Sequence, residues 1–188
     1  MAKNFPVVCL GASAGGLDAY TRLLREIPAE AGFAVVVVNH LRRQPTMLPE
    51  LLGKAASMHV QLITDGMPLE RNHVYVIPPN CDLTLSDHAF HLSPLSKPYG
   101  WPSVITVFLK SLAETWTGLP VAVILSGVGS DGADALRAIK TAGGITFAQK
   151  PETAEHPGMP ENAIDTGFVD FELSPEEIAH ELVRIQSY

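Results

Sequence analysis

Three side chains of this sequence have the chemistry of an acyl-transfer site. Ser13 carries a hydroxyl, His40 an imidazole and Asp131 a carboxylate. Each follows a short run of apolar, β-branched residues, which is typical of a buried strand. In a serine hydrolase the hydroxyl attacks a carbonyl carbon, the imidazole accepts the hydroxyl proton, and the carboxylate orients the imidazole. We therefore predict Ser13, His40 and Asp131 as the catalytic residues.

The turn around Ser13 supports its role as the nucleophile. Gly11-Ala12-Ser13-Ala14-Gly15 matches the pattern G-x-S-x-G, in which a sharp strand-to-helix turn exposes the serine oxygen. A helical pattern opens at Leu17, which brings the positive end of a helix dipole close to the serine. The amides of Ala14 and Gly15, or those of residues 127–129, are candidate donors to an oxyanion.

Each of these residues also has a structural interpretation. A Gly-rich turn after a first strand is more often a phosphate or dinucleotide cradle than an esterase site. Here Gly11-Ala12-Ser13 breaks the G-x-G pattern, and Val38-Asn39-His40 ends the second strand without an acid to hold a ribose. His40 alone could be a hydrogen-bonded core histidine, and Asp131 alone could cap the helix that follows it. The placement of all three at strand ends favours catalysis.

The elements that carry these residues predict an α/β fold. Apolar runs at Val7–Leu10, Ala34–Val38 and Val121–Leu125 alternate with amphipathic segments, as in βαβ units around a parallel, doubly wound sheet. Ligands of such sheets bind at the carboxyl ends of the strands. Leu83–Leu85 and Phe90–Leu92 predict a small antiparallel hairpin. The remaining predictions are helices at Leu17–Ile27, Met47–Ala56, Ser103–Glu114, Ala133–Ala142 and from Ser174, strands at Val60–Ile63, Val74–Ile77, Ile145–Ala148 and Phe168–Phe171, and a loop from Gln149 to Met159.

Composition restricts the class of protein. The 188 residues are expected to form one domain over positions 1–188, and a hydrophobic share of 46% predicts a substantial core. A formal net charge of −7 argues against nucleic acid and an anionic membrane surface as partners. No signal peptide and no apolar run of roughly 20 residues is present. Cys9 and Cys81 are expected to stay reduced, so we predict a cytoplasmic protein. The scattered histidines, His88 and His91 included, predict no metal site.

Four stretches of the chain together resemble a known family. They are Gly11-Ala12-Ser13-Ala14-Gly15-Gly16, Val38-Asn39-His40-Leu41, Gly129-Ser130-Asp131-Gly132-Ala133, and Gln149-Lys150-Pro151-Glu152-Thr153-Ala154 with Pro157-Gly158-Met159-Pro160. With these motifs the sequence resembles, over nearly its whole length, the catalytic domain of the chemotaxis protein-glutamate methylesterases (CheB-type).

The resemblance implies a fold, a reaction and partners. It implies a three-layer α/β/α sandwich and a triad of Ser13, His40 and Asp131, with no cofactor and no metal. The implied reaction is hydrolysis of glutamyl methyl esters on the cytoplasmic helices of methylated chemoreceptors, with glutamine deamidation as a second activity. Members of the family commonly carry an N-terminal receiver domain, which this sequence lacks. We therefore expect a stand-alone protein or part of a longer one, with a receiver or methyltransferase domain as an additional partner.

The sequence departs from the family pattern outside the triad. Val128 stands where the family usually has Met, and Asn39 where it often has Gln. The stretch His-Arg-Pro-Ser-Val-Asp of the family is Gly100-Trp101-Pro102-Ser103-Val104-Ile105 here. Two alternatives therefore stay open: a catalytically impaired docking or regulatory module, and an esterase with a different acyl substrate. Arg42, Arg43 and Trp101 are the candidate contacts to an acidic receptor helix.

Overall fold

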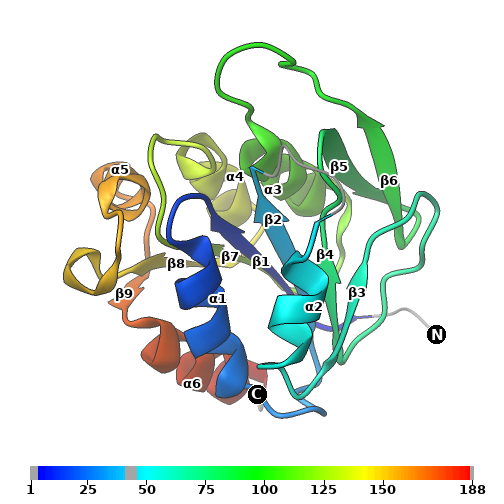
Figure 1. Cartoon of the computed structure of the whole chain (residues 1–188), viewed down its shortest axis with the longest axis horizontal. Helices are drawn as coiled ribbons and strands as arrows, with labels where there is room; N and C mark the ends of the chain where they lie inside the picture. The colour runs from blue at the N-terminus through cyan, green and yellow to red at the C-terminus, as the bar shows by residue number, and fades with distance from the viewer. Residues whose placement is uncertain (1–3, 41–45, 187–188) are drawn as a thin grey trace.

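The β-branched runs of the sequence pair side by side in one sheet. The computed structural model describes residues 4–40 and 46–186, and within them seven strands pair in the order β3-β4-β2-β1-β7-β8-β9 (Figure 1). All of these pairs are parallel, which confirms the prediction of a mainly parallel sheet. The strands are β1 (Val7–Ala12), β2 (Ala34–Asn39), β3 (His59–Leu62), β4 (His73–Val76), β7 (Pro120–Ile124), β8 (Ile145–Gln149) and β9 (Phe171–Leu173).

Helices cover both faces of this sheet, because successive residues of a buried strand point to opposite sides. On β1, Val8 and Leu10 join a core cluster with α1, α2 and α6, whereas Val7 and Cys9 join a second cluster with α3, α4 and α5 (Figure 1). Three-layer α/β/α packing is therefore confirmed. The helices are α1 (Gly16–Arg25), α2 (Leu48–Gly53), α3 (Val104–Thr115), α4 (Leu136–Thr141), α5 (Gly158–Asp165) and α6 (Pro175–Gln186), with short 3-10 turns at Ala133–Ala135 and Pro151–Thr153.

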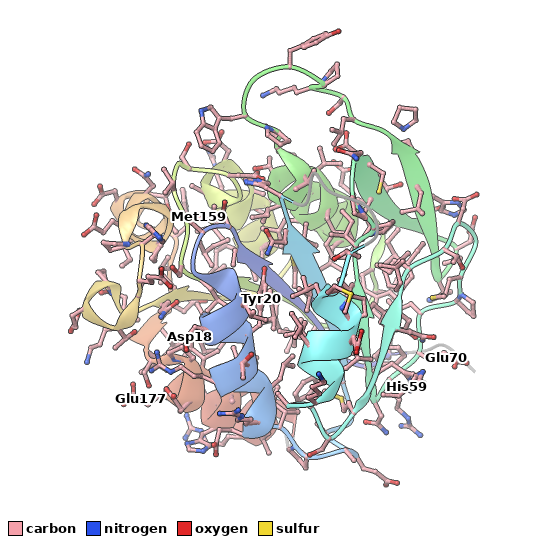
Figure 2. All side chains as sticks on the ribbon, viewed as in Figure 1. Asp18, Tyr20, His59, Glu70, Met159 and Glu177 are labelled. Carbon is pink, nitrogen blue, oxygen red and sulfur yellow. The ribbon has the colours of Figure 1, made fainter. Side chains whose placement is uncertain are left out.

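Buried side chains fill the space between the layers. Figure 2 shows Tyr20 on α1, where its hydroxyl donates to the carbonyl of Val38 over 3.2 Å, whereas His59 and Glu70 lie at the periphery. Cys9 is buried and not disulfide-bonded, and burial raises the pKa of its thiol far above the usual range. Cys9 is thus a core residue, as predicted. No helix in the described parts of the chain has the length and apolar composition to cross a membrane.

The predicted hairpin is present and lies on the α3 side of the sheet. Strands β5 (Cys81–Ser86) and β6 (Ala89–Pro94) pair antiparallel. Asp87 and His88 both have positive φ at the turn, as a two-residue type I′ connection requires. The hairpin is fixed to α3 by Ser111, whose hydroxyl accepts from the amide of Leu85 and donates to its carbonyl.

Two predictions near the C-terminus have the wrong bounds, although an edge strand is present as predicted. The last strand is β9 rather than Phe168–Phe171, because the Thr146 hydroxyl and the Asp170 carboxylate hold residues 168–170 in a tight connection. The predicted loop up to Met159 ends early, because α5 begins at Gly158. Pro160 is tolerated in this helix since it falls in the first turn, where a backbone N–H has no intrahelical acceptor.

Candidate active site

The sheet topology brings the three predicted residues to one edge. Ser13 directly follows β1 and His40 directly follows β2, and these strands are paired with Ala12 opposite Asn39. Asp131 lies in the loop after β7, the other neighbour of β1. The chain first adds strands on the β2 side of β1 and then crosses to the β7 side. This reversal is the topological switch point at which open α/β sheets bind ligands.

His40 and Asp131 form a buried hydrogen-bonded pair. The distance from His40 Nε2 to Asp131 Oδ2 is 2.7 Å, and the two side chains are 8% and 6% exposed. Two amides in the first turn of α3 complete the carboxylate's contacts: Ile105 donates to Oδ2 over 3.0 Å and Thr106 to Oδ1 over 2.9 Å. Asp131 thus caps α3, whose own N-cap Ser103 makes no side-chain capping bond. The interpretation of Asp131 as a cap of the helix that follows it is wrong, because its carboxylate accepts from amides of α3 instead.

The capping contacts keep Asp131 ionised. Burial by itself raises the pKa of this carboxyl group, but hydrogen bonds from His40 and from the Ile105 and Thr106 amides outweigh burial and hold the pKa below its usual range. An ionised carboxylate only accepts hydrogen bonds, so the bonded Nε2 of His40 carries a proton. In the neutral imidazole the other nitrogen, Nδ1, is then a hydrogen-bond acceptor.

Nδ1 of His40 is the ring nitrogen that can accept a proton from a group in the site. It is buried, and no described residue forms a hydrogen bond with it. His40 and Ser13 line the same hollow. Asn39, Leu48 and Glu155 also line it. Among the described residues there is no hydrogen bond between Ser13 and His40. Such contacts are often long before a substrate binds.

The backbone around Ser13 is a tight turn. The Gly16 amide donates to the Ser13 carbonyl over 3.0 Å, and Gly15 has φ 74° and ψ 3°. Positive φ at the third residue defines a type II turn and favours glycine there. The Ser13 amide donates to the carbonyl of Ser126 over 3.0 Å, which fixes the turn against the loop after β7.

The candidate oxyanion donors differ in availability. The Gly127 amide already donates to the carbonyl of His156 over 2.9 Å, so this predicted donor is engaged. The amides of Ala14, Gly15, Val128 and Gly129 form no hydrogen bond with any described residue. Both predicted donors on the nucleophile turn, the amides of Ala14 and Gly15, are therefore available. Of the three predicted donors at residues 127–129, two are available.

The residues that depart from the family pattern lie in two environments. Trp101 is 69% exposed and Val128 46%, and both line a second hollow beside His40 and Asp131. Ile105 is buried, gives its amide to Asp131, and packs so closely on β1 that a Cβ on Gly11 would lie 2.7 Å from it. Ile105 thus supports the site from within. Arg42 and Arg43 lie outside the described residues.

Sequence reasoning missed the residues that hold this site together. Ser126 and Gln149 are buried polar residues, Ser126 just after β7 and Gln149 at the end of β8. Thr106 donates its amide to Asp131, and its hydroxyl accepts from the amide of Gly132. A serine directly after a central buried strand was a usable signal for Ser126. In the described segments no three His, Cys, Asp or Glu side chains gather as metal ligands.

Comparisons with known proteins identify the family that this chain resembles in sequence and in fold. The family model described as CheB methylesterase matches residues 8–182. A "putative protein-glutamate methylesterase/protein-glutamine glutaminase" of Leptospira interrogans is 32% identical over 185 residues, which cover 97% of this chain and 95% of that protein. A Halobacterium salinarum protein named "protein-glutamate methylesterase/protein-glutamine glutaminase" is 34% identical over 179 residues, 92% of this chain but only 52% of that protein. The crystal structure of the Thermotoga maritima CheB methylesterase catalytic domain matches with a TM-score of 0.87 at 27% identity, covering 97% of this chain and 98% of that one.

Proposed function

Because the chain belongs to the CheB methylesterase family, we propose that it hydrolyses methyl esters of glutamate side chains on chemoreceptors, with Ser13, His40 and Asp131 as its triad. The observation that carries the assignment of the triad is the His40–Asp131 pair. Nδ1 of His40 has no hydrogen-bond partner among the described residues, and the imidazole borders the same hollow as Ser13. Deamidation of receptor glutamines is the second proposed activity.

In the proposed reaction, Nδ1 of His40 accepts the Ser13 proton while Ser13 Oγ attacks the γ-carbonyl carbon of the ester. The common serine-protease arrangement bonds Nδ1 to the carboxylate and uses Nε2 toward serine, so the imidazole here is used in the opposite orientation. Asp131 holds the proton on Nε2 and stabilises the imidazolium that forms. The methoxy group takes the proton from Nδ1 and leaves as methanol.

The second half of the reaction repeats these proton transfers with water. Nδ1 accepts a proton from water as the water oxygen attacks the acyl-enzyme, and it then returns the proton to Ser13 Oγ. The products are the glutamate carboxylate, methanol and one proton. Deamidation follows the same route, with ammonia leaving in place of methanol. The Ala14 and Gly15 amides, next to the N-terminus of α1, have no partner in the described part of the chain and are the proposed donors to the oxyanion in both halves.

Receptor docking is proposed at the second hollow. Trp101, Val107 and Val128 give it an apolar lining. Besides the His40–Asp131 pair, its charged side chains are Lys97, Lys110 and Asp134. These lysines suit a receptor helix rich in glutamate, which the net charge of −7 would otherwise repel. Cytoplasmic action, and partnership with a receiver domain or the opposing methyltransferase, complete the proposal.

The experiment that tests the function is release of methanol from methylated receptor by the purified chain. We expect release by the wild type and none above background by Ser13→Ala. A wild-type chain that releases no methanol from the receptor but cleaves a small neutral ester would favour the esterase with a different acyl substrate. A chain inactive on both would favour the docking module.

A further inference from the structure

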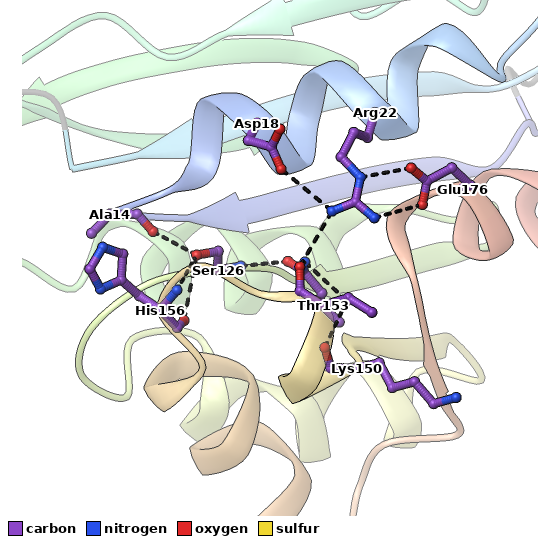
Figure 3. A network of polar contacts seen from close by, with 9 residues as sticks. Ala14, Asp18, Arg22, Ser126, Lys150, Thr153, His156 and Glu176 are labelled. Atoms are coloured by element: carbon purple, nitrogen blue, oxygen red, sulfur yellow. Dashed lines mark hydrogen bonds and ion pairs between the residues drawn. The ribbon is translucent and has the colours of Figure 1, made fainter.

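A second serine, Ser126, is connected to the nucleophile turn through its hydroxyl and its carbonyl. Ser126 is 1% exposed. Its hydroxyl donates to the carbonyl of Ala14 over 2.8 Å and accepts from the amide of His156 over 3.0 Å (Figure 3). The same hydroxyl also lies 3.5 Å from the His156 carbonyl. Its carbonyl accepts from the Ser13 amide, and its amide donates to Gln149 Oε1 over 2.9 Å.

The Ala14 carbonyl belongs to the central peptide of the type II turn. Type I and type II turns differ mainly by a flip of this peptide, which exchanges the directions of its C=O and N–H groups. Because a trans peptide points C=O and N–H to opposite sides, the bond from Ser126 to the Ala14 carbonyl directs the Gly15 N–H away from Ser126. That N–H has no partner among the described residues, and Gly15 lines the hollow shared by Ser13 and His40.

The nucleophile turn and the loop that carries Ser126 are in close contact, and further hydrogen bonds fix this loop. A Cβ on Gly15 would lie 2.5 Å from Ser126 Oγ, so only glycine permits this approach. Behind Ser126, Gln149 Nε2 donates to the Thr153 carbonyl over 3.0 Å. Arg22 on α1 donates to the same carbonyl and forms a two-bond pair with Glu176 of α6 (Figure 3). Ser126 is therefore bonded to β8 through Gln149, and Gln149 is linked through the Thr153 carbonyl to α1 and α6.

We propose that Ser126 is a positioning residue, whose hydroxyl holds the Ala14–Gly15 peptide so that the Gly15 amide faces the oxyanion of the reaction. This inference rests on the proposed function of Ser13. Ser126 itself touches no reacting atom and exchanges no proton. Its effect is expected in the transition state, where the negative oxygen forms, more than in substrate binding.

The test is Ser126→Ala in the full chain, assayed on the γ-methyl ester of N-acetylglutamate. We expect kcat to fall about tenfold to a hundredfold with KM within about twofold of wild type, as for loss of a transition-state contact. The pH dependence of the remaining rate should keep its shape, since His40 and Asp131 are untouched. Ser126→Thr, which keeps the hydroxyl, should restore kcat to within about threefold.

Thr146→Val is the matched control. Thr146 is buried in β8, and its hydroxyl also donates to a carbonyl (Phe168) and accepts from an amide (Asp170), but at the β9 side of the sheet. Thr146→Val should lower thermal stability about as much as Ser126→Ala while leaving kcat unchanged. If Ser126→Ala does not fold, the nearly isosteric Ser126→Cys takes its place with the same expectation.

Two outcomes would overturn the inference: a folded Ser126 variant without the hydroxyl whose kcat stays within about twofold of wild type, or equal losses of kcat in that variant and Thr146→Val. Failure of the proposed function would look different, because the wild type would then release no methanol from the receptor, or Ser13→Ala would release as much as the wild type.

Discussion

Asp131 and Asp170 are two carboxylates with nearly the same kind of hydrogen-bonding partners, at two ends of the molecule. Asp131 accepts from two α3 amides and from His40. Asp170 accepts from the Thr146 amide and hydroxyl and, over 2.7 Å, from Lys140. In both, burial raises the pKa of the carboxyl group but hydrogen bonds lower it more, so the net shift is downward.

The two carboxylates differ in the cation beside them and in their access to water. Asp170 pairs with the ammonium group of Lys140, and this pair is 35% and 29% exposed, whereas the His40–Asp131 pair is 8% and 6% exposed. Only the buried pair contains a histidine, the side chain that most often acts as a general base. The comparison shows that an ionised, well-bonded aspartate can serve structure alone. The catalytic role proposed for Asp131 depends on the histidine and on the hollow that the histidine borders.

The largest predicted effect is a loss of kcat when Asp131 is replaced, with no such loss when Asp170 is replaced. Asp131→Asn should lower kcat on a small methyl ester by roughly 10³ to 10⁴, because an amide side chain can stabilise the wrong imidazole tautomer. Ser13→Ala and His40→Ala should cost roughly 10⁴ to 10⁶. Asp170→Asn should leave kcat within about twofold of wild type. Steady-state kinetics on the purified variants checks all four, and comparable losses at Asp131 and Asp170 would remove the distinction.

The second effect is the pH dependence of the rate. Since neutral imidazole is the proposed base, the rate should rise about tenfold from pH 5 to pH 7, the range in which histidine side chains lose their proton. Asp170→Asn should follow the wild-type curve. The profile is measured on a small ester, so that receptor docking does not limit the rate. A curve that stays flat from about pH 5 to 9 contradicts His40 as the base.

The third effect concerns stability in acid, where both carboxylates should contribute. A pKa that is lower in the folded state means that the unfolded chain binds the proton more tightly. The contribution is therefore fully present above about pH 4, the usual range of an unfolded aspartate, and is lost as the pH falls through the folded-state pKa. Asp170→Asn should lower the free energy of unfolding by about 1–2 kcal/mol at pH 7 and by less at pH 2. Urea denaturation at both pH values measures the difference; an equal loss at both would contradict the lowered pKa.

The smallest effect should come from the exposed cation. Lys140→Met removes a partly solvated ion pair, which is worth about 0.5–1 kcal/mol at most. Its effect on the free energy of unfolding should shrink further in 1 M salt, because exposed charges are screened. Activity should not change. A loss above about 3 kcal/mol would mean that Lys140 acts through packing rather than through its charge.

Much of the fold and part of the site could be predicted from the sequence. Ser13 and His40 each directly follow a continuous apolar strand, so their shared edge follows from βαβ topology. The capping of α3 by Asp131 could not be predicted, because it joins a loop to a helix about 25 residues earlier in the chain and depends on how the layers pack. The position of β9 depends likewise on the long-range hydrogen bonds of Thr146 and Asp170, which no local sequence pattern predicts.

The most direct test of the central claim, that Ser13 is the nucleophile, is labelling of the intact chain with a fluorophosphonate, followed by mass spectrometry of its peptides. A serine activated by a neighbouring base forms a stable phosphonyl ester with this reagent, and an ordinary serine does not. We expect one label on the peptide that contains Ser13, formed in Asp170→Asn as in wild type and strongly reduced in His40→Ala. Labelling of another serine, or no labelling of a chain that still releases methanol, would contradict the account.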